Sequence, residues 1–136
     1  CYGARSEEFL AGVEDFQQAG VETLLCTDDG TRGHHGLVTE RLEELLQESA
    51  ANKSNSNESG IKERIVCCGP EPMMEAVSKI ADQYQVPCQV SLETPMACGL
   101  GICFSCVAKI RDESGEWDYQ RTCVEGPVFD AERIVW

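Results

Sequence analysis

The sequence reads Glu93-Thr-Pro-Met-Ala-Cys98-Gly-Leu-Gly-Ile-Cys103-Phe-Ser-Cys106 in its C-terminal third. With Cys123 this stretch completes the pattern C-x4-C-x2-C-x16-C, which is the ligand spacing of plant-type [2Fe–2S] clusters. Glycines between the first two cysteines permit the positive φ that a loop needs to bend around two irons. We therefore predict that a [2Fe–2S] cluster is bound by four ligands, Cys98, Cys103, Cys106 and Cys123.

Three other uses of these cysteines have to be weighed. Zinc sites are usually built from paired C-x2-C units or from mixed cysteine and histidine, whereas this chain has a single C-x2-C. The adjacent residues His34 and His35 lie far away in sequence and make a poor chelate. A disulfide framework fits badly with an odd total of nine cysteines. Cysteines that only fill a core would not lie among loop glycines, so the cluster is favoured over these alternatives. A cysteine-rich metal site suits a reducing compartment, and a cytoplasmic location is therefore expected.

Composition limits the classes of partner. The chain has 136 residues, of which 42% are hydrophobic, as is ordinary for a globular protein. A formal net charge of −13 would repel nucleic-acid phosphates and anionic lipid surfaces, so neither nucleic acid nor membrane is an expected partner. Solubility alone also explains an acidic surface, and the charge therefore says little about protein partners.

Strand and helix patterns alternate before the cysteine loop. A helix is predicted from Ser6 to Gly20, with Phe9, Val13 and Phe16 on one face. An apolar strand follows at 21–27, and then a polar loop at 28–36 whose three glycines leave the backbone open to a ligand. The next helix has its buried stripe at Val38, Leu42, Leu45 and Leu46.

The second half of this alternation leads into the cysteine loop. A loop is predicted at 52–60, and a strand at 65–68. Pro72 suits the first turn of a third helix, and a short strand at 90–92 follows it. Alternation of this kind predicts an α/β fold with a doubly wound parallel sheet, in which ligands bind at the C-terminal ends of the strands.

A β-hairpin is predicted after the third cysteine. Val107 and Ile110 precede the turn Glu113-Ser-Gly-Glu116, and Trp117 and Tyr119 follow it. A hairpin would return the chain to the loop and deliver Cys123. Apolar loop residues are expected to shield the cluster: Met96, Ala97, Leu100, Ile102 and Phe104. We predict two domains, a partial nucleotide-binding domain at 1–92 and a cluster-binding domain at 93–136.

The chain resembles the ferredoxin–NAD(P) reductase superfamily, and within it the electron-transfer subunit of NAD-dependent dihydroorotate dehydrogenase. The resemblance covers essentially the whole chain. It is carried by four groups of residues: Tyr2-Gly-Ala-Arg5, Thr27-Asp-Asp-Gly30 with Gly33, Gly36 and Val38, Cys68-Gly-Pro-Glu-Pro-Met73, and the four cluster cysteines. The Cys-Gly-Pro motif marks the superfamily, and its combination with a [2Fe–2S] loop is more specific.

The resemblance implies a path of electrons from NADH through FAD and the cluster to FMN in a separate catalytic subunit, which oxidises dihydroorotate in pyrimidine biosynthesis. It places Cys68, Gly69 and Pro70 on the nicotinamide side of the nucleotide site. It places Arg5 and Asp28 near the other end of the nucleotide. Simpler interpretations stay open, because Gly69-Pro70 and the aspartates also suit turns, and an exposed arginine often forms a surface ion pair.

Several family features are absent from the sequence. Members carry an N-terminal β-barrel with a flavin motif, then a first strand and a Gly-rich phosphate loop. The opening residues Cys1-Tyr-Gly-Ala-Arg5 suggest the end of a strand instead. We therefore expect a C-terminal fragment of a longer subunit, with a truncated sheet. FAD and NAD are expected cofactors of the full-length protein, and binding of either by the fragment alone should be weak.

Two alternative functions stay open. An equivalent subunit could feed a hydrogenase, a sulfite reductase or a ferredoxin oxidoreductase. A four-cysteine zinc or iron–sulfur module without redox catalysis is the other possibility. Paired carboxylates and activated nucleophiles are not evident in the sequence, so no catalytic residue is predicted. The chain is expected to be one component of an oxidoreductase complex.

Overall fold

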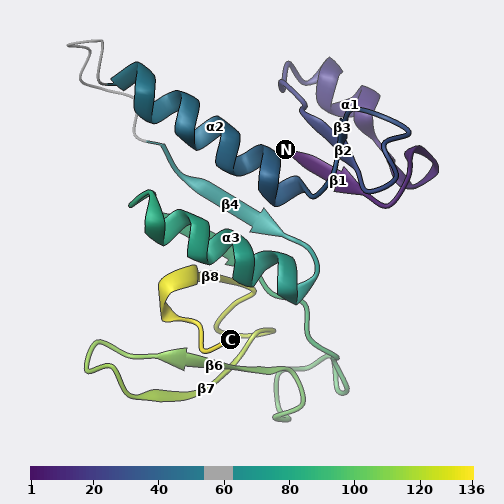
Figure 1. Cartoon of the computed structure of the whole chain (residues 1–136). Coiled ribbons are helices and arrows are strands. Elements are labelled where there is room, and N and C mark those ends of the chain that lie inside the picture. Colours follow the sequence, from purple (N-terminus) through teal and green to yellow (C-terminus); the bar gives the residue numbers. More distant parts are fainter. Residues whose placement is uncertain (54–62) are drawn as a thin grey trace. The chain divides into compact units, whose positions relative to one another are not determined.

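The computed structural model describes residues 1–53 and 63–136, which belong to two units, Cys1–Ser59 and Gly60–Trp136. Both units mix helices with short strands, in agreement with the predicted α/β class (Figure 1). The predicted loop at 52–60 begins inside a helix that runs to Lys53, and its remaining residues lie outside the described ranges.

The first unit contains a parallel three-stranded sheet. Its strands are β1 (Tyr2–Ala4), β2 (Leu25–Thr27) and β3 (His34–His35), and they lie in that order. Helix α2 (Val38–Lys53) packs against β2, whose residues Cys26 and Thr27 are fully buried. The polar loop predicted at 28–36 therefore contains a short strand, because His34 and His35 pair with Cys26 and Thr27.

The predicted helix from Ser6 to Gly20 is wrong as a single element. The segment forms a 3₁₀ turn, η1 (Glu7–Phe9), and a short helix, α1 (Val13–Gln18). Gly12 lies between them at a φ of 69°, which breaks the helical path. Of the three residues predicted to share one helix face, only Val13 is buried, and Phe9 and Phe16 are exposed.

The second unit contains a mixed sheet covered by a helix. Strands β4 (Ile65–Cys68) and β5 (Cys88–Ser91) are parallel, and α3 (Glu71–Gln83) connects them. Pro72 lies in the first turn of α3, as predicted from the lack of a backbone N–H. Strand β8 (Val128–Asp130) pairs antiparallel with β5 on its other side.

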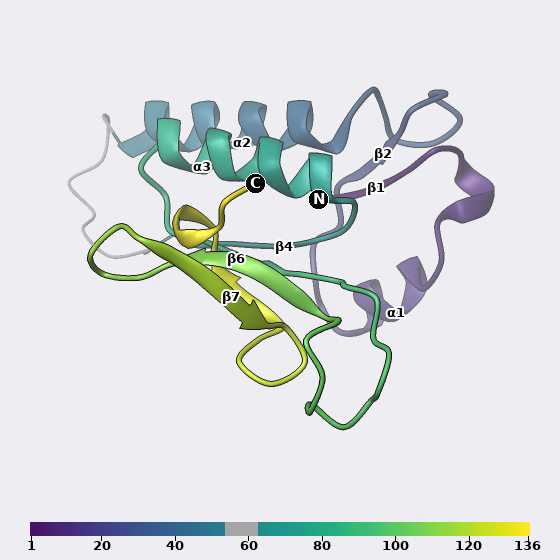
Figure 2. The ribbon, with the colours of Figure 1, turned by 90° about the horizontal axis from the view of Figure 1, so that it is seen from below.

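The core of the second unit joins this sheet to a β-hairpin. Strands β6 (Val107–Arg111) and β7 (Trp117–Arg121) form the hairpin, whose two antiparallel strands are seen in Figure 2. An antiparallel bridge links Ile110 of β6 to Ile134, just after the turn η2 (Ala131–Arg133). The buried cluster comprises Met74, Val90, Ile110, Phe129, Ala131 and Ile134.

The sheet of the second unit draws strands from both sides of the predicted boundary at residue 92. Strand β5 ends at Ser91, and its partner β8 comes from beyond residue 93. In the described ranges the strands form three small sheets, and the single doubly wound sheet stays a prediction. Within those ranges, no helix has both the length and the apolar content to cross a membrane.

Candidate metal centre

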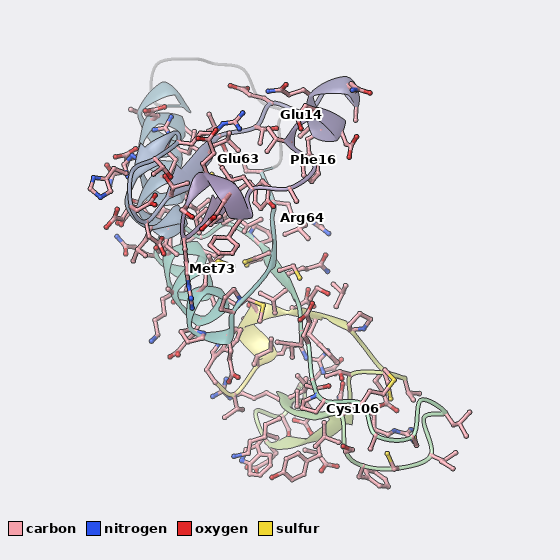
Figure 3. The ribbon with its side chains drawn as sticks, turned by 90° about the vertical axis from the view of Figure 1, so that its right-hand side faces the viewer. Glu14, Phe16, Glu63, Arg64, Met73 and Cys106 are labelled. Carbon is pink, nitrogen blue, oxygen red and sulfur yellow. The ribbon has the colours of Figure 1, made fainter. Side chains whose placement is uncertain are left out.

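Cys106 and Cys123 lie side by side at the base of the hairpin. Cys106, which is labelled in Figure 3, is fully buried immediately before β6. Its Sγ lies 2.9 Å from the Sγ of Cys123. The hairpin creates this proximity, because β6 and β7 pair from Val107 to Arg121 and return the chain to the loop. Thr122 N–H then donates to Cys106 O over 2.9 Å.

Cys98 and Cys103 form a second pair within the loop. The N–H of Leu100 donates to Cys98 Sγ over 3.4 Å. This N–H, and then groups of Cys103, lower the pKa of the Cys98 thiol to about 6. Donors aimed at a sulfur favour its anionic form, and the thiolate is the form that binds metal. The first half of the loop therefore favours a metal-binding thiolate.

The donor set fits an iron–sulfur cluster in its chemistry and its pairing. The four thiols form two pairs, Cys98 with Cys103 and Cys106 with Cys123, and the hydrogen bond that Cys123 shares with Cys106 raises the pKa of Cys123. Among the described residues, no group of three metal-binding side chains is close enough to hold a single ion. The assignment of all four cysteines to one cluster therefore stays a prediction.

Residues that the sequence patterns did not identify hold the cysteine loop against the ribbon, meaning strand β7 and the residues that follow it as far as Glu125. Thr122 is buried, and its hydroxyl contacts Thr94 and lies 3.3 Å from Cys106 O. Arg121 donates to Gly101 O over 2.9 Å. These contacts join residues 16 to 28 positions apart in sequence. No local motif could have identified them.

The apolar loop residues do not form the expected shield in this structure. Met96, Leu100, Ile102 and Phe104 have exposed fractions between 59% and 76%. Instead, the loop presents an apolar surface to solvent.

Cys68, Gly69 and Pro70 lie where β4 ends and α3 begins. Cys68 is the last residue of β4, and Pro70 accepts the first N–H bonds of α3 from Met73 and Met74. Gly69 and Pro70 line a pocket of about 690 Å³. The other side of this pocket is formed by residues that precede the cysteine loop or belong to the hairpin and the final segment, among them Leu92, Glu93, Thr94, Tyr119 and Trp136.

Arg5 and Asp28 follow neighbouring strands of the first unit. The N–H of Asp28 donates to Ala4 O, and the N–H of Asp29 donates to Arg5 O, so the two strand ends are adjacent. Both Arg5 and Asp28 are exposed. Asp29 has a structural role. Its carboxylate accepts hydrogen bonds from the backbone N–H and the hydroxyl of Thr31, and these bonds lower the pKa of Asp29.

The glycines of the first unit are not all open to a ligand. A side chain at Gly33 would collide with the backbone carbonyl of Leu25. Gly33 therefore permits β2 and the loop before β3 to approach each other closely, and this packing explains its presence without a ligand. The structure thus separates the proposed nucleotide residues by unit, with Arg5 and Asp28 in the first and Cys68, Gly69 and Pro70 in the second.

Comparisons with known proteins agree with this chemistry. Residues 93–135 match the family described as the iron–sulfur cluster binding domain of dihydroorotate dehydrogenase B. The electron transfer subunit of dihydroorotate dehydrogenase B (NAD(+)) from Caldanaerobacter subterraneus is 38% identical over 98% of this chain and 47% of its own length. A probable electron transfer subunit from Methanocaldococcus jannaschii is 36% identical over 97% of this chain and 44% of its own length.

A solved structure extends the comparison to the fold. It is an NADH-dependent reduced ferredoxin-NADP oxidoreductase studied for flavin-based electron bifurcation. The TM-score is 0.70 with 29% identity, covering 98% of this chain and 42% of the other. The chain spans just under half the length of the curated relatives described above. Over that span it is similar to the electron transfer subunits of dihydroorotate dehydrogenase B, as the sequence predicted, and its residues 93–135 match the iron–sulfur cluster binding domain of that enzyme.

Proposed function

We propose that this chain transfers electrons through a [2Fe–2S] cluster as part of the electron transfer subunit of an NAD-dependent dihydroorotate dehydrogenase. The observation that carries the proposal is the contact between Cys106 and Cys123, whose sulfur atoms lie 2.9 Å apart within the segment that matches the cluster-binding family. The spacing of Cys98 and Cys103 before them completes the plant-type pattern.

The four cysteines would hold the cluster, and the bound cluster would accept and release one electron at a time. The protein supplies the donors around it. Leu100 N–H contacts the sulfur of Cys98, and such hydrogen bonds stabilise the more negative, reduced state and raise the reduction potential. Thr122 holds the carbonyl of Cys106 through its N–H, which fixes the third ligand relative to the fourth.

Electrons would enter from NADH through FAD in the complete subunit. Arg5 and Asp28 are proposed to contact one end of the nucleotide, and Cys68, Gly69 and Pro70 the nicotinamide side. Support comes from their positions after parallel strands, where α/β proteins bind ligands. The pocket beside Gly69 also reaches Glu93 and Thr94, so a group bound there would lie next to the predicted cluster domain at 93–136.

The electron acceptor would be a catalytic subunit that carries FMN and oxidises dihydroorotate. A second acceptor class is favoured by one observation, the similarity to the ferredoxin-NADP oxidoreductase, which covers 98% of this chain. Copurification of the complete subunit with an FMN protein would support the first. Reduction of ferredoxin or NADP, without such a partner, would support the second.

The cluster itself is tested by anaerobic expression followed by iron, sulfide and zinc analysis, with Cys123→Ser as the paired variant. The proposal predicts two irons and two sulfides per chain in the wild type and a large loss in the variant. Cys1→Ser is a matched control, because Cys1 is exposed and lies outside the predicted cluster domain. Stoichiometric zinc without sulfide would contradict the proposal and identify a four-cysteine zinc module.

A further inference from the structure

Arg121 connects the cysteine loop to the ribbon that carries Cys123. It is the last residue of β7, two positions before Cys123. Its Nη1 donates to Gly101 O over 2.9 Å. Gly101 lies between Cys98 and Cys103, so this bond ties the middle of the loop to the start of the segment that supplies the fourth ligand.

Glu125 holds the guanidinium of Arg121 in place. Arg121 Nη2 lies 2.7 Å from Glu125 Oε1, and Arg121 Nε lies 3.4 Å from Glu125 Oε2. Glu125 Oε2 also accepts the backbone N–H of Arg121 over 2.6 Å. The two side chains are 28% and 36% exposed, so the pair is partly shielded from water. A two-point contact with a carboxylate orients the plane of the guanidinium.

Two further contacts lie close to the hydrogen bond between Arg121 and Gly101. The ring of Phe104 lies under the guanidinium carbon of Arg121, at 5.6 Å from the ring centre. Gly101 also lies close to Val124, because a Cβ added at Gly101 would lie 2.7 Å from a methyl carbon of Val124. The loop therefore touches residues on both sides of Cys123 in sequence. Arg121 provides the directional contact, because its rigid planar fork binds the Gly101 carbonyl and the Glu125 carboxylate in one fixed geometry.

We infer that Arg121 is a positioning residue for the proposed cluster, which holds the loop at Gly101 against the Cys123 ribbon and places a fixed positive charge beside the cluster. This inference rests on the proposed function. A positive charge near an iron–sulfur centre stabilises its reduced, more negative state and so raises its reduction potential. Glu125 opposes this effect with its own charge and also orients Arg121.

The test compares R121Q, R121K and E125Q in the protein reconstituted anaerobically with iron and sulfide. Two quantities are measured, the rate at which a ferrous chelator removes iron and the midpoint potential of the cluster. We expect R121Q to release iron roughly 10- to 100-fold faster than the wild type and to have a more negative potential. R121K keeps the charge without the fork, so its potential should stay near the wild-type value while iron release is faster.

E125Q distinguishes charge from position. It removes a negative charge, so its potential should shift to more positive values, opposite to R121Q, while iron release is also faster. R133Q is the matched control, because Arg133 Nε also donates to a backbone carbonyl, that of Arg111, which lies outside the cysteine loop. Neither its potential nor its release rate should change.

The outcomes separate this inference from the proposed function. A wild-type protein that assembles no cluster would overturn both. A loaded wild type whose R121Q and E125Q variants keep its potential and its release rate would overturn the inference and leave the proposed function standing. Equal potential shifts in R133Q and R121Q would also overturn it, because the effect would then be one of net charge and not of position.

Discussion

The hydroxyl groups of Thr94 and Thr122 meet in a hydrogen bond across the base of the cysteine loop. Thr94 precedes the first of the four predicted ligands, and Thr122 directly precedes the last, so one bond closes the segment that contains the other three, Cys98, Cys103 and Cys106. Thr122 is 4% exposed, and its N–H also binds Cys106 O. The loop is therefore anchored at its base by a buried polar contact.

Replacing Thr122 by valine should destabilise the second unit. The side chain keeps its shape but loses its hydroxyl, which leaves the Thr94 hydroxyl without this partner. We expect the free energy of unfolding to fall by roughly 1 to 2 kcal/mol. Urea unfolding followed by tryptophan fluorescence measures this change. Ser105→Ala is the comparison, because its hydroxyl bonds to Pro95 O at an exposed position and its loss should cost less; equal losses would contradict the explanation.

Gly101→Ala should impair cluster assembly more than Gly99→Ala. Both glycines have positive φ, 74° and 65°, so both substitutions strain the backbone. Only at Gly101 would the new Cβ also collide, with a methyl group of Val124 at 2.7 Å. Iron content after identical anaerobic reconstitution measures the difference. If Gly99→Ala is as defective as Gly101→Ala, packing against Val124 has no part in holding the loop.

Protonation of Asp112 should weaken the turn of the hairpin. The carboxylate accepts the N–H of Ser114 over 2.8 Å and its hydroxyl over 2.6 Å, and these bonds lower the pKa of Asp112. Since the folded pKa is lower than the unfolded value of about 3.9, the stabilisation is complete above that value and is lost as the pH falls through the folded pKa. The Ser114 amide resonance should report this titration by NMR, with its midpoint below pH 3.9. A midpoint at or above that pH would contradict the hydrogen bonds.

Cys88 should react slowly with iodoacetamide. Burial raises the pKa of its thiol to about 11, so only on the order of 0.1% is thiolate at pH 8. Cys68 is exposed at the end of β4 and is the comparison within the same unit. Mass spectrometry of peptides after a timed reaction should find Cys68 modified well before Cys88. Equal rates would mean that the β4–β5 sheet opens readily.

The ligand prediction needed only local information, because the spacing from Cys98 to Cys106 is written in consecutive residues. The start of α3 was equally predictable, since Pro72 suits a first turn whatever surrounds it. Helix α1 shows the limit of such patterns. The apolar period through Phe9 and Val13 predicted a continuous helix, but Gly12 adopts a left-handed conformation and divides the segment.

Contacts over long sequence separations could not be predicted from the sequence. Arg121 and Gly101 lie 20 residues apart, and Thr94 and Thr122 lie 28 apart. Each bond exists only because the hairpin of β6 and β7 brings the chain back to the loop. The pairing of β8 with β5 has no local signature either. For the same reason, sequence patterns predict which residues bind iron but not which residues fasten the loop that carries them.

Electron paramagnetic resonance of the anaerobic, dithionite-reduced protein tests the central claim most directly. A [2Fe–2S] cluster held by Cys98, Cys103, Cys106 and Cys123 predicts a spin-½ signal that integrates to about one spin per two irons. The signal should be lost or altered in Cys123→Ser. A protein that contains zinc, gives no such signal, or keeps an unchanged signal in Cys123→Ser would contradict the account.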